Sequence, residues 1–90
     1  MAEQLAELNK GNNLKIYEAG NATINKDNYV IIGTLPAEYQ GAKAYLVTAD
    51  ANGAYLTGGV NVGSYDIYGY NNYTGVASLT FNGIKVVCIF

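Results

Sequence analysis

The C-terminal stretch VASLTFNGIKVVCIF, residues 76–90, has two runs of mostly apolar residues on either side of Asn82-Gly83. Short runs rich in β-branched and aromatic residues are typical of β-strands. Asn-Gly is the preferred pair for a two-residue hairpin turn, because both positions need positive φ. We therefore predict two antiparallel strands, residues 76–81 and 84–90, joined by a tight turn at Asn82-Gly83.

This predicted hairpin has two different faces. One face is apolar throughout and pairs Phe81 with Ile84, Leu79 with Val86, and Ala77 with Cys88. The other face is polar near the turn and becomes apolar toward the C-terminus, whereas a sheet face in water stays polar along its length. We therefore expect the far half to be covered by the rest of the fold, by the N-terminal segment or by a neighbouring chain. If a chain covers it, the oligomer-interface residues are Val76, Val87, Ile89 and Phe90.

The remainder of the chain from residue 14 onward is rich in Tyr, Val, Ile, Thr, Asn and Gly, with turn signals every few residues. This pattern is typical of an antiparallel all-β domain, and the spacing suits a small β-sandwich or jelly roll over residues 14–90. The loop Asp50-Ala51-Asn52-Gly53 is expected to join two paired strands, with Val47 opposite Leu56. The predicted strands are residues 14–18, 22–25, 29–34, 42–49, 54–57, 60–70 with a break near Gly63, 76–81 and 84–90.

Residues 1–13 differ in composition from the β-rich part. Good helix formers precede Gly11, and Leu5 and Leu8 are three residues apart, so we predict one or two helical turns. These two leucines are the candidate residues for docking on a larger protein. A frayed tail is equally consistent, because isolated helices this short are unstable in water.

Composition limits the classes of function. The chain has 90 residues, a net charge of -2, one cysteine and no histidine, so we expect neither an internal disulfide nor a recognisable zinc site. A domain of this length is only marginally stable alone, and association with other chains is the remaining source of extra stability. The five lysines are scattered and arginine is absent, which argues against nucleic-acid binding. No apolar run approaches the roughly 20 residues of a membrane span. The acidic N-terminus lacks the features of a secretory signal, so we expect synthesis in a cytoplasm.

Residues for catalysis are also scarce. Cys88 lies in the apolar run VVCIF, where a thiol is usually a small buried hydrophobe, and Ser64 and Ser78 have no histidine to activate them. We predict no enzymatic activity, no cofactor and no metal.

The best candidate binding surface is the tyrosine-rich segment around GYNNYTG, residues 69–75. Strand alternation directs Tyr65, Ile67 and Gly69 to the core and the intervening side chains to the surface. Tyrosine and asparagine combine rigid rings with hydrogen-bonding groups, which suits saccharides as well as protein contacts. Strand propensity and ordinary turn chemistry explain the same residues without a ligand. The candidate ligand-binding residues are Asp66, Tyr68, Tyr70, Asn71, Asn72 and Tyr73.

The sequence ATINKDNYVIIGTLPAEYQGAKAYLVTADANGAYLTGGVNVG, residues 22–63, followed by a turn and a terminal hairpin, resembles small β modules of bacteriophage tail or head fibres and baseplate proteins. The likeness is carried by residues 32–36, IGTLP, and by Asn52-Gly53. It implies a trimeric, jelly-roll-like protein that takes part in virion assembly or attaches to host-surface saccharides. The chain departs from long fibre proteins because it lacks a shaft, which is more consistent with a decoration or accessory subunit.

These observations together predict a non-enzymatic phage virion structural protein that is synthesised in a bacterial host cytoplasm. It is expected to be a homotrimer that acts through assembly with a larger virion protein, with attachment to a host-surface saccharide as an additional role left open. Two alternatives remain. One is a carbohydrate-binding module that uses Tyr68, Tyr70 and Tyr73, and the other is a small inhibitor of a host protein.

Overall fold

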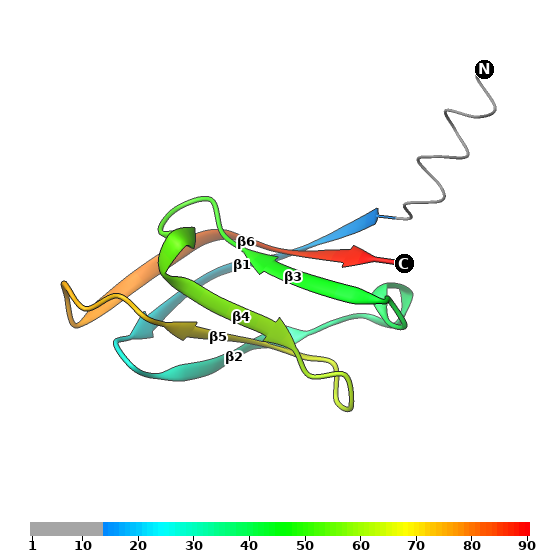
Figure 1. Ribbon diagram of the computed structural model, residues 1–90, viewed down its shortest axis with the longest axis horizontal. Helices are drawn as coiled ribbons and strands as arrows, with labels where there is room; N and C mark the ends of the chain where they lie inside the picture. Colours follow the sequence, from blue (N-terminus) through cyan, green and yellow to red (C-terminus); the bar gives the residue numbers. More distant parts are fainter. Residues whose placement is uncertain (1–13) are drawn as a thin grey trace, which may run out of the picture.

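The computed structural model describes residues 14–90, which form an antiparallel β-sandwich (Figure 1). Sheet A has the strand order β1-β6-β3 and sheet B has the order β2-β5-β4. The two sheets form the two layers seen in Figure 1, and the fold class predicted from the sequence is confirmed. The strands are β1 (Leu14–Asn25), β2 (Tyr29–Thr34), β3 (Ala44–Thr48), β4 (Leu56–Val60), β5 (Asp66–Asn71) and β6 (Ser78–Ile89).

The prediction of a hairpin turn at Asn82-Gly83 is wrong. The chain continues through these residues as the single strand β6, which lies between β1 and β3 in sheet A. A type I′ turn needs positive φ at both residues, but of this pair only Gly83 has it, at 62°. The runs predicted to pair with each other instead pair with β1, from Leu14 opposite Ile89 to Asn25 opposite Ser78.

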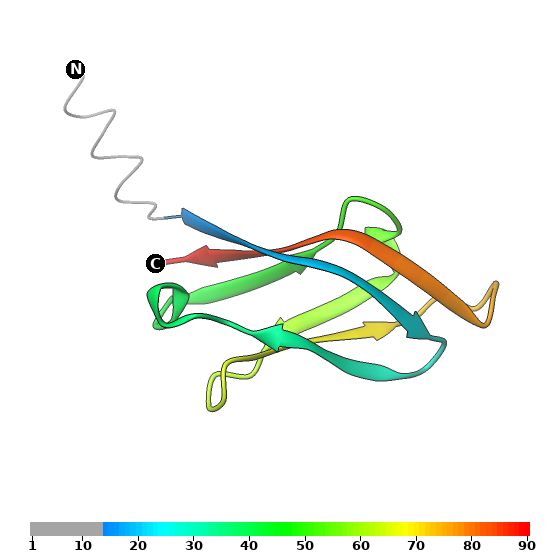
Figure 2. The same cartoon turned by 180° about the vertical axis from the view of Figure 1, so that it is seen from behind.

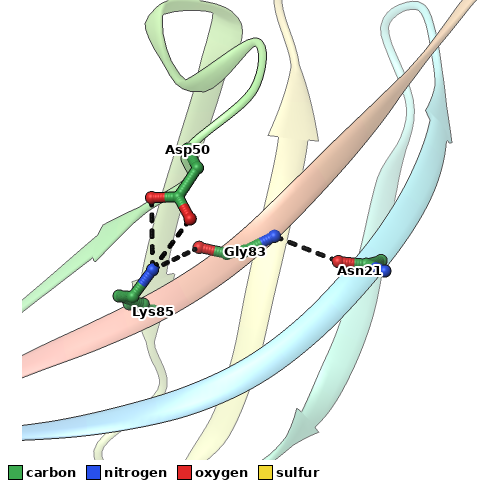
Figure 3. Close-up of polar contacts among 4 residues, drawn as sticks. All are labelled: Asn21, Asp50, Gly83 and Lys85. Carbon is green, nitrogen blue, oxygen red and sulfur yellow. Dashed lines mark hydrogen bonds and ion pairs between the residues drawn. The ribbon is translucent and has the colours of Figure 1, made fainter.

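The backbone at Asn82-Gly83 makes hydrogen bonds to other segments instead of closing a turn. The carbonyl of Asn82 accepts from the backbone N–H groups of Asp50, at 2.8 Å, and Ala51, at 3.3 Å. The N–H of Gly83 donates to Oδ1 of Asn21 in β1, at 3.0 Å (Figure 3). Buried or crowded backbone groups need such partners, and here the partners come from the connection after β3 and from β1.

The loop at residues 50–53 connects the sheets and does not join two paired strands as predicted. It leads from β3 in sheet A to β4 in sheet B, by way of a 3-10 turn at Gly53–Tyr55. Val47 and Leu56, predicted to be opposite each other in one sheet, lie in different sheets and both face the core. The loop packs on β6, where Nδ2 of Asn52 donates to the carbonyl of Thr80 at 2.8 Å.

The predicted short strands at residues 14–18 and 22–25 are one long strand, β1. Its pairing with β6 shifts register on both sides of Gly20, which has a φ of 95°. Irregularities of this kind bend a strand without ending it. Figure 2 shows β1 and β6 curving together across the sandwich toward sheet B.

The core lies between the two sheets. The inward residues Phe81, Ile84, Val86 and Cys88 of β6 were predicted correctly although its pairing was not. Alternation holds on each side of Asn82-Gly83 and changes phase there, since Phe81 and Ile84 are three positions apart and both are buried. Tyr65, predicted for the core, is half-buried at its edge. The buried hydrophobic residues are Ile24, Leu35, Val47, Leu56, Ile67, Phe81, Ile84, Val86 and Cys88.

The predicted N-terminal helical segment, with Leu5 and Leu8, lies outside the described residues. Within residues 14–90 no helix is both long and apolar enough for a bilayer span.

Candidate binding surface

The outer face of sheet B carries most of the predicted ligand-binding residues. Along β5, exposure alternates strictly, so Ile67, Gly69 and Asn71 face the core while Asp66, Tyr68 and Tyr70 face outward. The sequence prediction for these three outward side chains agrees with this arrangement, because alternation on a regular strand fixes their direction.

The neighbouring strand β2 adds two residues that the sequence analysis missed. Tyr29 is opposite Tyr70 and Ile31 is opposite Tyr68, so both share the outer face. The rings of Tyr29 and Tyr68 have their centroids 5.7 Å apart at a tilt of 41°, and 59% of Tyr29 is exposed. The alternation in YVIIGT, residues 29–34, was the signal that could have identified them.

On the other side of β5, strand β4 leaves room for the ring of Tyr68. Gly59 is opposite Tyr68, and a Cβ atom at Gly59 would lie only 2.8 Å from Cζ of that tyrosine. Any other residue would displace the ring, so the glycine lets Tyr68 lie across the sheet. We call the outer surface formed by Tyr29, Ile31, Thr57, Asp66, Tyr68, Tyr70 and Asn72 the tyrosine face.

Two hydroxyl groups fix the carboxylate of Asp66 at one end of the tyrosine face. Thr34 Oγ1 donates to Oδ1 and Ser64 Oγ donates to Oδ2, each at 3.1 Å. An ionised carboxylate offers about four acceptor positions, so Asp66 retains capacity for further donors.

At the other end, Tyr70 interacts with the connection between β1 and β2. Its hydroxyl group donates to Oδ1 of Asp27 at 3.3 Å. Desolvation raises the pKa of Tyr70 above its usual value, and the negative charge of Asp27 and this hydrogen bond raise the pKa further.

The three loop residues predicted to extend this surface have different positions. Asn72 belongs to the tyrosine face, because its Nδ2 donates to Oγ1 of Thr57 at 2.9 Å and Thr57 is opposite Tyr70. Tyr73 instead packs on Tyr55, with ring centroids 4.3 Å apart.

Asn71 does not belong to this surface, which corrects the prediction. Strand β5 extends to Asn71, so alternation directs this side chain inward, where it is fully buried. Its Nδ2 donates to the carbonyl of Ile24 at 2.8 Å, and its Oδ1 accepts from the N–H of Tyr73 at 2.9 Å. Asn71 therefore has a structural role at the end of the core.

The residues predicted for a subunit contact are not contiguous. Val87 and Ile89 lie on the outer face of sheet A, but Val76 precedes the start of β6, about 40 Å from Ile89 along an extended chain. Their predicted proximity depended on the hairpin, which does not exist. Phe90 is half-buried against the core, with Nζ of Lys15 at 5.4 Å from its ring centroid.

No known protein family, curated protein or solved structure matches the chain. Among residues 14–90, no group of three or more His, Cys, Asp or Glu side chains is arranged to hold a metal ion.

Proposed function

We propose that this chain is a non-enzymatic structural protein of the bacteriophage virion type, an attachment module whose tyrosine face binds a host-surface saccharide. The observation that carries the proposal is the presence of Tyr29, Tyr68 and Tyr70 on one open sheet face together with hydrogen-bonding groups. Saccharides have apolar ring faces and polar edges, and both features have counterparts here.

The aromatic rings supply the apolar contact. Tyr29 and Tyr68 are adjacent, with centroids 5.7 Å apart, and tyrosine offers rigid contact area at a low cost in conformational entropy. A sugar ring that stacks on either ring replaces water on an apolar surface.

The polar groups of the tyrosine face orient the sugar through hydrogen bonds. Asp66 is held by Thr34 and Ser64, so its remaining acceptor positions are preorganised for sugar hydroxyl groups. The side chains of Thr57 and Asn72 add further donors and acceptors at the opposite end of the face.

The size of the tyrosine face favours a small ligand over a protein partner. A stable protein–protein interface uses about 20–30 residues on each side, whereas the tyrosine face has the seven residues named above. A single site of this size binds weakly, and many copies on one particle raise the overall avidity without any new contact. This is the arrangement expected of a virion protein.

The resemblance of residues 32–36 and Asn52-Gly53 to phage fibre and baseplate modules supports the same proposal. In those modules, attachment to host-surface saccharides is one of the two typical roles.

A glycan array of bacterial surface saccharides tests the proposal. We expect binding by the natural chain and a loss of at least about tenfold on Tyr68→Ala or Tyr29→Ala, the scale of one aromatic contact. Leu46→Ala is the matched control, because Leu46 is a large exposed residue on sheet A. Absence of binding to every saccharide, or an equal loss in the control, would contradict the proposal.

A further inference from the structure

The outer face of sheet A carries a group of aliphatic side chains, the exposed Leu14, Ile16, Leu46 and Ile89 and the half-buried Val87, which we call the aliphatic face. They occupy two adjacent cross-strand rows. Leu14 is opposite Ile89, and Val87 lies between Ile16 in β1 and Leu46 in β3. Leu14, Ile16 and Leu46 are 55%, 54% and 58% exposed.

The aliphatic face ends abruptly at the next row. There Lys85 lies between Glu18 and Thr48, and Nζ of Lys85 is 3.0 Å from Oδ2 of Asp50. A polar boundary around clustered apolar side chains is typical of a contact surface.

The aliphatic face is too small for a stable contact with a second copy of the chain. Such an interface needs about 20–30 residues on each side, and the charged row at Glu18 and Lys85 limits the apolar area to the five side chains. A narrow amphipathic segment has a footprint of the right size, because a helix is about 10 Å wide and β1 and β3 are about 10 Å apart across β6.

We propose that residues 1–13 of the same chain cover the aliphatic face, with Leu5 and Leu8 directed onto it. The segment joins β1 at Leu14, which is itself part of the face. The intervening residues 9–13, NKGNN, are polar and include Gly11, and an extended stretch of that length spans about 16 Å. This reach allows the chain to reverse over sheet A.

The covalent connection also favours this occupant over a separate molecule. A segment held by a short flexible linker has an effective concentration in the millimolar range at its own surface. At micromolar chain concentrations, the tethered segment therefore occupies the face before a second copy does. In this proposal, Val87 and Ile89 are covered by residues 1–13 and not by another subunit. The proposal does not depend on which ligand the tyrosine face binds.

Disulfide trapping in the full-length chain tests the inference. The variant Leu8→Cys with Leu46→Cys is oxidised mildly at low micromolar concentration and analysed by mass and by a non-reducing gel. The control is Leu8→Cys with Thr57→Cys, since Thr57 is exposed on sheet B. The natural Cys88 is buried and stays in place.

We expect a disulfide within one chain in the Leu46 variant, in at least tenfold excess over the control. Equal trapping in both variants, or none in either, would show that the segment does not occupy the aliphatic face. A disulfide between two chains in the Leu46 variant would assign the face to a second copy and overturn the inference.

A second measurement does not require new cysteines. The double substitution Leu5→Ala and Leu8→Ala is expected to shift the methyl NMR resonances of Leu46 and Val87 and to leave those of the core residue Leu56 unchanged. Unchanged resonances at Leu46 and Val87 would contradict the inference.

Discussion

The backbone N–H of Gly83 in β6 donates to Oδ1 of Asn21 in β1 at 3.0 Å (Figure 3). This hydrogen bond lies where the register of the two strands is irregular. On the other side of Gly83, Asp50 accepts from Nζ of Lys85, at 3.1 Å and 3.0 Å from its two carboxylate oxygens. Gly83 is thus the point where β1, β6 and the connection between the sheets meet.

Gly83→Ala is expected to lower the free energy of unfolding by about 1–2 kcal/mol, the usual cost of a left-handed backbone for a residue with a Cβ atom. The φ of Gly83 is 62°, and an added Cβ would also lie 2.7 Å from Cγ of Asp50. Urea denaturation monitored by far-UV circular dichroism measures the change.

Gly33→Ala is the control for this substitution. Nothing lies within 4 Å of a Cβ atom added at Gly33, so the urea midpoint should be unchanged or slightly higher. Equal destabilisation by the two alanine variants would show that Gly83 has no special conformational role.

Asn71→Ala is expected to destabilise the fold by about 2 kcal/mol, because it leaves one buried and one partly buried hydrogen-bonding group without partners. These groups are the carbonyl of Ile24 and the N–H of Tyr73. Asn72→Ala removes one exposed hydrogen bond and should change stability by less than about 1 kcal/mol. Chemical denaturation of both variants makes the comparison, and the reverse order would contradict the structural role of Asn71.

Asp27→Asn is expected to lower the pKa of Tyr70 toward its usual value near about 10. Desolvation is the main cause of the raised pKa and would remain, but the charge of Asp27 and its acceptor role would be removed or weakened. Because the pKa is raised in the folded chain, the associated stability is present below the unfolded pKa and is lost as pH rises through the folded pKa. NMR titration of the Tyr70 ring measures the shift, and an unchanged pKa would refute the role of Asp27.

Cys88 should react slowly with iodoacetamide in the folded chain. Its side chain is fully buried, and burial raises the pKa of the thiol more than the charge of Lys15 lowers it. At pH 8 we expect modification to be about a hundredfold slower than in concentrated urea, since the reaction must wait for local opening. Similar rates in both solutions, followed by mass spectrometry, would show that this part of the core opens readily.

Side-chain direction was the most predictable feature of this sequence. Alternation within regular strand segments identified Ile84 and Val86 as inward and Tyr68 and Tyr70 as outward, because the period of two is a local property of an extended chain. The same rule applied one residue further would have placed Asn71 inside.

Strand pairing was not predictable in the same way. Asn82-Gly83 has the composition of a hairpin turn, yet long-range hydrogen bonds with Asp50 and Asn21 stabilise a continuous strand that is irregular at Gly83. Local turn preference was overridden by contacts between residues more than 30 positions apart in sequence. For this reason the predicted pairing of Val76 with Ile89 was wrong, and Tyr29 and Ile31 were missed at the tyrosine face.

The most direct test of the tyrosine face is an NMR titration of the tyrosine ring resonances with a saccharide that binds on the array. The account predicts shifts at Tyr29, Tyr68 and Tyr70 and none at Tyr17, Tyr39 or Tyr45, which pack against the core. Shifts confined to the second group, or no shift at Tyr68, would contradict a saccharide site on sheet B.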